Sequence, residues 1–289
     1  MAYEFIKVDR TDGVLLITMH DPATRNSLSS EMQGEMRQEL DRFERDTDDR
    51  VLLLTGSEPS FCSGANVKRM DQSARDREAR QREAPQDDGS DSLPWGKVEM
   101  RLGVREETGD GTFQVGAFPL RIHKLQKPSI AAVNGHAYGV GMGVSLACDI
   151  RLASEKAVFS EAFVLRGLIP GDGSCWQLPR MIGLSNTFLL QYTGDRIDGN
   201  EAYRMNLVSK VYPHEEMMPA AMELAARLAA GPTQAMSLTK YLVQKSLHTD
   251  LEESMATGHV TQMVARQSED HKEAARAFVE KRKPAFKGR

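Results

Sequence analysis

Three glycine-rich turns are the parts of the sequence that could carry chemistry. They read SFCSGAN at 60–66, NGHAYGVGMG at 134–143 and IPGDGS at 169–174. Glycine lets a backbone approach a ligand closely, and two turns that end neighbouring strands can aim two N–H groups at one oxygen atom, which is the geometry of an oxyanion hole. The second turn has neither the G-x-G-x-x-G pattern of dinucleotide sites nor the Gly-Lys-Ser/Thr of phosphate loops.

The elements that must position these turns begin with a strand, a helix and a second strand. The apolar runs at 14–19 and 51–56 have the length and the flanking turn residues of buried strands. Between them, Ser29 offers an N-cap, and the large apolar residues that follow lie on one face of a helix. Two continuously apolar strands joined by a helix favour parallel pairing in an α/β fold.

The same alternation continues through the centre of the chain and then gives way to helices. Further strands are expected at 128–133, 149–153 and 157–159. From about residue 183 the apolar spacing becomes helical, with helices expected around 222–228, 236–247 and 274–281. The sequence therefore predicts an α/β core followed by a helical C-terminal third.

Composition and charge exclude several classes of protein. The chain has 289 residues, a net charge of −4 and three scattered cysteines, so neither a disulfide framework nor a cysteine metal knuckle is expected. No apolar run is long enough for a membrane span, no signal peptide is expected, and no metal-ligand spacing is found. Without a basic stripe, nucleic acid is not an expected partner. A cytoplasmic location, with no membrane partner and no metal, is the expectation.

The excess of negative charge lies in one segment. Residues 71–118 carry 11 acidic and seven basic side chains, which accounts for the whole net charge of −4. The first part of this segment has few large apolar residues and is broken by Pro85 and Gly89. A solvated helix ending in a loop is typical of this composition, and a lid over a substrate pocket is compatible with it.

The chain resembles the crotonase (enoyl-CoA hydratase/isomerase) superfamily over nearly its whole length. Six segments carry the resemblance: FCSGANVKRM, KPSIAAVNGHAYGVGMG, CDIRLASEKAVFSEAF, GLIPGDGSCWQLPRMIG, YTGDRID and FVEKRKPAFKG. The resemblance implies an α/β fold with a ββα spiral core over 1–200, in which segment 71–118 covers an acyl pocket, and a helical trimerisation region over 201–289. It also implies an acyl-CoA thioester substrate, no cofactor besides its CoA, and a homotrimer or homohexamer.

The resemblance also assigns roles to individual residues. The backbone N–H groups of Ala65 and Val140 would form the oxyanion hole. At the second position the family usually has glycine, but only the N–H is needed. The candidates for binding CoA or substrate are Arg25, Ser63, Ala65, Asn66, Lys68, Gly141, Phe163, Trp176 and Lys281. For the three basic residues the alternative is ordinary solvated charge, and for the two aromatic residues it is core packing.

The departures from the family pattern bear on the reaction. Typical hydratases carry two glutamates that hold one water, and those positions fall at Gly143 and Phe163 here. Asp172 in the third turn and Glu161 are the carboxylates nearby in sequence, and they are the candidate acid and base. The alternative for Asp172 is a cap on the following helix. A β-diketone hydrolase branch shares the PGDG motif but pairs its aspartate with a histidine at the position of Phe163.

Three functions follow from these residues. The first is a lyase or isomerase of the enoyl-CoA hydratase/isomerase type, as found in fatty acid metabolism, which forms an enolate in an oxyanion hole and lacks both usual hydratase glutamates. The second is a hydrolase that cleaves a carbon–carbon bond of a β-dicarbonyl substrate. The third is a non-catalytic scaffold that binds acyl-CoA. The missing glutamates favour the scaffold, and the retained glycine turns argue against it.

Overall fold

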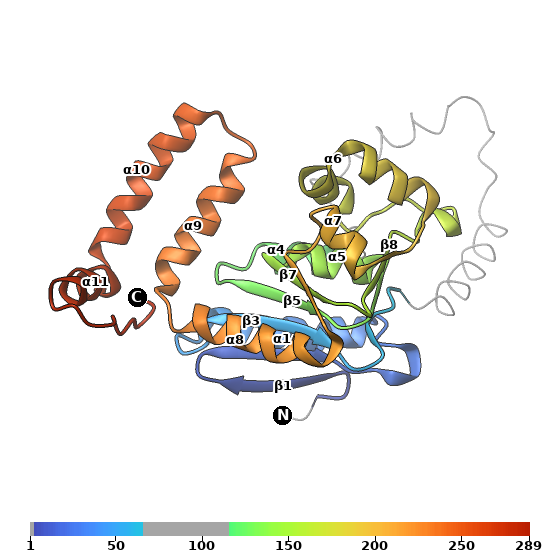
Figure 1. Ribbon diagram of the computed structural model, residues 1–289, viewed down its shortest axis with the longest axis horizontal. Coiled ribbons are helices and arrows are strands. Elements are labelled where there is room, and N and C mark those ends of the chain that lie inside the picture. The colour runs from blue at the N-terminus through green and yellow to red at the C-terminus, as the bar shows by residue number, and fades with distance from the viewer. Residues whose placement is uncertain (1–2, 66–115) are drawn as a thin grey trace, which may run out of the picture. The chain divides into compact units, whose positions relative to one another are not determined.

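The computed structural model describes residues 3–65 and 116–289, which belong to one compact unit of the chain (Figure 1). The charged segment at 71–118 lies outside the described residues, apart from its last three positions. None of the described helices is long and apolar enough to cross a membrane.

The N-terminal part folds as its apolar pattern predicts. β1 (Ile6–Thr11) and β2 (Val14–Met19) form an antiparallel hairpin, and β2 pairs in parallel with β3 (Val51–Gly56). Between β2 and β3 lies α1 (Ser30–Arg45), and the Ser29 hydroxyl oxygen caps it by accepting a hydrogen bond of 3.0 Å from a backbone N–H of the first turn. Both expected strands and the helix between them are confirmed.

Successive pairs of strands build the centre of the fold. The two strands of each pair follow one another in the chain but join different sheets. The pairs are β3 and β4 (Ser60–Cys62), β5 (Ser129–Val133) and β6 (His136–Tyr138), and β7 (Ile150–Ser154) and β8 (Val158–Ser160). The next described helices are α4 (Ala117–His123), α5 (Val140–Ala147) and, after the short 3-10 helix η2 (Val164–Arg166), α6 (Ser174–Thr193). The first strands of the pairs join a sheet of order β1-β2-β3-β5-β7-β10, and the second strands join a sheet of order β4-β6-β8-β9. This path is the expected ββα spiral.

Two apolar clusters hold the layers together, and β3 contributes to both. Leu52 and Leu54 belong to the cluster that also contains apolar side chains of α1, α4 and α5. Leu53 points to the opposite face of the sheet and belongs to a second cluster with Met217 and Ala221 of α8 (His214–Ala229). Successive side chains of a strand point to opposite faces, so a strand that is apolar at every position must be covered on both sides.

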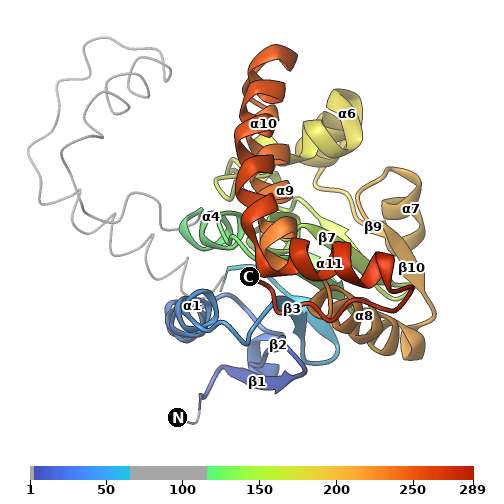
Figure 2. The same cartoon turned by 90° about the vertical axis from the view of Figure 1, so that its left-hand side faces the viewer.

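The C-terminal third is helical, as expected, and its first part packs on the core. β9 (Ile197–Asp198), α7 (Gly199–Arg204) and β10 (Lys210–Tyr212) precede α8, and β10 pairs in parallel with β7. α9 (Thr233–Ser246), α10 (Leu251–Gln267) and α11 (Glu269–Val279) follow, and α9 and α10 lie side by side (Figures 1 and 2). The division at residue 200 stays a prediction, while β10 and α8 lie on the core sheet.

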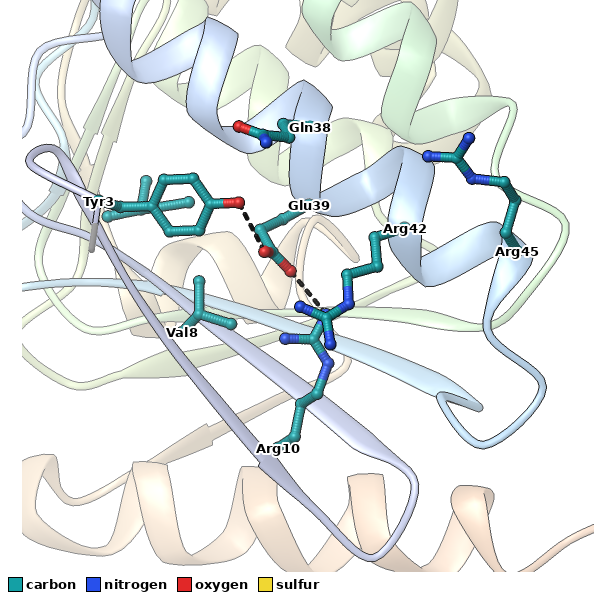
Figure 3. A pocket seen from close by; sticks show the side chains of 8 residues that line it. Tyr3, Val8, Arg10, Gln38, Glu39, Arg42 and Arg45 are labelled. Atoms are coloured by element: carbon teal, nitrogen blue, oxygen red, sulfur yellow. Dashed lines mark hydrogen bonds and ion pairs between the residues drawn. The ribbon is translucent and has the colours of Figure 1, made fainter. Parts of the chain in front are cut away.

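A charged cluster joins β1 to α1 (Figure 3). Arg10 donates to Glu39 at 2.6 Å and to Asp49 at 3.1 Å, and the Tyr3 hydroxyl donates to Glu39 at 2.6 Å. Burial acts to raise the pKa of Glu39, but the hydrogen bonds from Tyr3 and Arg10 outweigh it and lower that pKa. Tyr3, Arg10 and Glu39 line a hollow of about 530 Å³. One arginine thus pairs with two carboxylates, so the cluster serves as a link between the two elements.

Lys127 ties the end of α1 to the start of β5. Its ammonium group donates to the backbone carbonyl oxygens of Phe43, Asp46 and Asp49 at 2.5, 2.5 and 2.6 Å. These carbonyls lie in the last turn of α1 and in the loop after it, where intrahelical donors are missing and the helix dipole favours a cation. The ammonium also lies 4.8 Å from the centroid of the Phe43 ring.

We expect Lys127→Met to lower the free energy of unfolding by about 2 kcal/mol or more, because three carbonyls lose a charged donor at once. Lys124→Met is the matched control, since Lys124 is exposed. Urea unfolding of both variants at one protein concentration measures the difference. Equal unfolding midpoints would show that Lys127 does not tie α1 to the sheet.

Candidate active site

The first and second glycine turns meet backbone to backbone. They follow β4 and β6, which are neighbours in the four-stranded sheet. A Cβ atom at Gly64 would lie 2.5 Å from the Tyr138 carbonyl oxygen, and one at Gly141 would lie 2.3 Å from the Cys62 carbonyl oxygen. Gly64 also has a left-handed φ of 91°. Only residues without a side chain allow this approach, so the glycines are what make the two turns adjacent.

A buried asparagine holds the first turn in place. Asn26 has a left-handed φ of 59°, and its side-chain amide donates to the carbonyl oxygens of Ser57 and Ser60 at 2.7 Å each. The carbonyl oxygen of Gly64 accepts a hydrogen bond of 2.9 Å from the Leu28 N–H. The loop around Asn26 therefore fixes the position of the first glycine turn.

Arg25 and Ser63, two candidates for binding CoA, lie together at this loop. The Ser63 N–H donates to the Arg25 carbonyl oxygen at 3.1 Å, and the Ser63 hydroxyl donates to the Thr24 carbonyl oxygen at 2.8 Å. Arg25 is exposed and has a left-handed φ of 57°. The Ser63 hydroxyl is thus used within the protein, whereas the Arg25 side chain faces solvent.

The two N–H groups expected to form an oxyanion hole lie on the adjacent turns. Val140 is the first residue of α5, where a backbone N–H has no intrahelical acceptor. Ala65 is the last residue described in the first turn, and its N–H donates to no backbone carbonyl in the described ranges. A Cβ atom on the neighbouring Gly64 would lie 3.9 Å from the Val140 nitrogen. Both groups therefore belong to one small region of the fold.

Glu161 and Asp172 lie in one buried cluster. Glu161 follows β8, Asp172 lies two residues before α6, and both are essentially unexposed, at 0% and 1%. Between them lies the Ser174 hydroxyl, 2.9 Å from Glu161 Oε2 and 2.7 Å from Asp172 Oδ1. The Ser174 N–H also donates to Asp172 Oδ1 at 3.1 Å, so Asp172 does accept a bond from the start of the helix. It is both a local cap and half of a carboxyl pair.

Burial raises the pKa of both carboxyl groups. It is the largest effect on Glu161, the charge of Asp172 adds to it, and together they raise the pKa of Glu161 to about 8. Burial also raises the pKa of Asp172, against two hydrogen bonds from Ser174 that lower it. In the described part of the chain, Glu161 Oε1 and Asp172 Oδ2 have no hydrogen-bond partner. Burial and the neighbouring charge thus favour the protonated form of Glu161, and each carboxyl has one oxygen without a partner among the described residues.

The Asp172 carboxylate occupies the space beside Gly143. A Cβ atom at Gly143 would lie 2.3 Å from Asp172 Oδ2 and 2.9 Å from Asp172 Cβ. Gly143 is the position to which the family resemblance assigns the first hydratase glutamate, one turn along α5 from Val140. The chain therefore lacks a side chain at that position and brings a carboxylate to the same place from another loop.

The two aromatic candidates lie in different surroundings. The Phe163 ring packs over the second glycine turn, where a Cβ atom at Gly139 would lie 3.6 Å from it. The Trp176 ring stacks on His248 at 5.7 Å, meets His123 edge-on at 5.6 Å, and has the Arg180 guanidinium 4.1 Å from its centroid. Phe163 thus borders the glycine turns, while Trp176 joins α6 to α4 and to the end of α9.

Of the remaining candidates, the structure describes Lys281 alone and does not bring it to this cluster. Asn66 and Lys68 lie outside the described residues. Lys281 follows α11, and Figure 1 shows that helix well away from α5 and β8. Burial raises the pKa of the Cys62 thiol to about 12, which makes it a poor nucleophile. Over the ranges 3–65 and 116–289, no group of His, Cys, Asp and Glu side chains could hold a metal ion.

Two residues of the site were not identified from the sequence. Ser174 directly follows the PGDG turn, and a hydroxyl two residues after an acid at a helix start is a signal that could have pointed to it. Asn26 carried no such signal, because its partners Ser57 and Ser60 are more than 30 positions away. Its role depends on the folded loop alone.

The chain is similar to known proteins over nearly its whole length. The enoyl-CoA hydratase/isomerase family model matches residues 9–91 and 99–289. A crotonyl-CoA hydratase of Syntrophomonas wolfei is 30% identical over 99% of both chains, and a 1,2-epoxyphenylacetyl-CoA isomerase of Escherichia coli is 31% identical over 99% of both. A solved enoyl-CoA hydratase from Bacillus anthracis is 29% identical with a TM-score of 0.82, covering 99% of this chain and 100% of that one. The chain belongs to the enoyl-CoA hydratase/isomerase family.

Proposed function

We propose that this enzyme converts an acyl-CoA thioester through an enolate, with Glu161 and Asp172 moving the proton. The observation that supports this most strongly is the place of the Asp172 carboxylate, whose Oδ2 would lie 2.3 Å from a Cβ atom at Gly143. Gly143 is one turn from Val140, so the carboxyl pair lies close to the N–H groups that would hold the thioester oxygen. The proposal needs no cofactor besides the CoA of the substrate.

The reaction is a transfer of a proton between two carbon atoms. The ionised carboxylate takes a proton from carbon, and the electron pair of that C–H bond moves onto the thioester oxygen. The N–H groups of Ala65 and Val140 stabilise this negative charge, each by about 10²–10³ in rate. The other carboxyl, which starts protonated, then gives its proton to a different carbon, and this shifts the double bond.

Transfer of a proton fits these residues better than addition of water. The two positions at which hydratases carry glutamate hold Gly143 and Phe163. Phe163 also takes the position of the histidine that a β-diketone hydrolase would need, and Asp172 is bonded to Ser174 instead. Relatives of this chain are named both as hydratases and as isomerases, so the carboxyl groups must decide between the reactions.

We also propose that the enzyme is a cytoplasmic homotrimer or homohexamer. Several large apolar side chains of α10 are strongly exposed in the single chain, at 52% to 75%: Leu251, Met255, Val260 and Met263. Exposed apolar patches of this kind are typical of surfaces that are buried against another subunit.

A direct test offers the enzyme a short trans-2-enoyl-CoA and the corresponding 3-enoyl-CoA, and follows both by NMR. We expect the two positions of the double bond to interconvert faster than water is added. Faster hydration would contradict the preference for proton transfer. Calorimetric binding of CoA without turnover of any acyl-CoA would support the scaffold, and cleavage of a β-diketone without CoA binding would support the hydrolase.

We expect Asp172→Asn to lower kcat by about 10²–10⁴-fold, because the amide keeps the shape of the side chain but cannot accept a proton. Affinity for CoA, measured by calorimetry, should stay unchanged. Asp195→Asn is the control, since Asp195 is exposed. Turnover within a few-fold of the parent enzyme would show that Asp172 only caps α6.

We expect Gly143→Ala to reduce kcat strongly, because its Cβ would lie 2.3 Å from Asp172 Oδ2 and must displace that carboxylate. Gly34→Ala on α1 is the matched control, since a Cβ there meets nothing within 4 Å. Steady-state kinetics and circular dichroism of both variants separate a local effect from misfolding. Full activity of the Gly143 variant would place the reacting atoms away from Asp172.

A further inference from the structure

One hydroxyl joins the two carboxyl groups of the proposed site. Ser174 is the first residue of α6 and is fully buried. Its Oγ lies within hydrogen-bond distance of Glu161 Oε2, at 2.9 Å, and of Asp172 Oδ1, at 2.7 Å. The Gln191 side-chain amide approaches the same Oγ at 3.5 Å. Ser174 is therefore the only bridge between the two carboxyl groups in the part of the chain that the structure describes.

The hydrogen bonds at Ser174 require that the two carboxyl groups share one proton. A serine hydroxyl carries one hydrogen, and an ionised carboxylate can only accept hydrogen bonds. For both contacts to be hydrogen bonds, one carboxyl must be protonated and must donate to Ser174 Oγ. The Ser174 N–H donates to Asp172 Oδ1 at 3.1 Å, which favours the ionised form there and leaves the proton on Glu161.

The surroundings give no support to a second negative charge. The groups that face the pair are the Ser174 hydroxyl, the Gln191 amide and the Cys175 thiol, whose pKa is raised by burial and then by the charges of Glu161 and Asp172. No cation contributes to the pKa of either carboxyl over the described residues. Two ionised carboxylates buried without a cation would repel each other, so a single negative charge is the stable state.

After a proton shift by two different groups, the protonation states of the two carboxyl groups are exchanged. Asp172 takes a proton from one carbon and Glu161 gives its proton to another, so Asp172 ends protonated and Glu161 ends ionised. Before the next turnover one proton must return from Asp172 to Glu161. When the Asp172 carboxyl has turned its proton onto Oδ1, the Ser174 hydroxyl can in one step give its hydrogen to Glu161 Oε2 and accept that proton. One O–H bond of serine breaks and one forms, so the step needs no co-reactant.

We propose that Ser174 is a positioning residue that relays this proton and resets the carboxyl pair after each turnover. The inference rests on the proposed proton transfer by Glu161 and Asp172. It goes beyond that function because it assigns a separate step, the return of the enzyme to its starting protonation state, to a residue outside the proposed acid–base pair. Both carboxyl groups are buried in the described part of the chain, so the Ser174 hydroxyl is the most direct route between them.

Rapid-mixing kinetics of Ser174→Ala test the relay. We expect a first turnover at close to the parent rate, with about one product per site, followed by a steady-state rate lower by about tenfold or more because the pair is no longer reset. Ser174→Thr keeps a hydroxyl and should restore much of the steady-state rate. Ser145→Ala is the matched control, because this buried hydroxyl donates only to the Met142 carbonyl oxygen, at 2.7 Å.

Infrared spectroscopy of the full-length protein provides a readout that does not depend on activity. The parent enzyme should show the C=O band of one protonated carboxyl at neutral pH, and Glu161→Gln should remove it. In Ser174→Ala the band should shift and its titration midpoint should move. Above about pH 8 the parent band should disappear as Glu161 ionises, and kcat should fall with it.

The two proposals fail in different ways. Steady turnover by Ser174→Ala at the parent rate, with an unchanged infrared band, would overturn the relay and leave the proposed function standing. Absence of turnover on every acyl-CoA would overturn the proposed function. In that case a band that depends on Ser174 would still support the shared proton, and a band that does not would overturn it.

Discussion

The rest of this site depends on two buried carboxyl groups that contact one serine hydroxyl. Charge is expensive to bury, and an unpaired buried carboxylate is stable only where hydrogen bonds replace its lost water. Glu161 and Asp172 meet this condition with a single hydroxyl, at 2.9 and 2.7 Å, so one of them must be neutral. In the proposed mechanism, that requirement divides the pair into an acid and a base.

The spiral of ββα units makes this meeting possible. Glu161 leaves the end of β8, and Asp172 lies in the turn before α6, so the chain must fold back over η2 to bring them together. Gly143 on α5 completes the arrangement by leaving room, because any side chain there would collide with the Asp172 carboxylate. A glycine and an acid on separate elements thus act as one unit.

The residues that hold the fold together differ from those that are proposed to transfer the proton. The backbone contact between the turns at Gly64 and Gly141 needs only glycines and two neighbouring strands, and it fits a family in which different reactions share one fold. Lys127 and the Arg10 cluster hold α1 against the sheet at the outside of this scaffold. The identity of the proton-transfer groups depends on a few side chains beyond it. For this reason relatives named for hydration and for isomerisation resemble this chain equally well.

Local patterns in the sequence were enough for several of the elements. The apolar runs of β2 and β3 predicted buried strands, Ser29 predicted the start of α1, and the glycine turns predicted close backbone approach, because each depends on neighbours only a few positions away. The carboxylates at 161 and 172 could also be chosen as candidates from their place beside these turns. Segment 71–118, which the resemblance expects to cover the acyl pocket, lies largely outside the described residues.

The tertiary structure alone decided which side chains meet. It placed Ser174 between Glu161 and Asp172, put the Asp172 carboxylate where the side chain of residue 143 would be, and directed Trp176 toward His248. It also gave Asn26 a role with partners more than 30 positions away. Periodicity reports how a segment meets the core, whereas a hydrogen bond between side chains on different elements depends on how those elements pack. The family could therefore be read from the sequence, but the contacts of Ser174 with Glu161 and Asp172 could not.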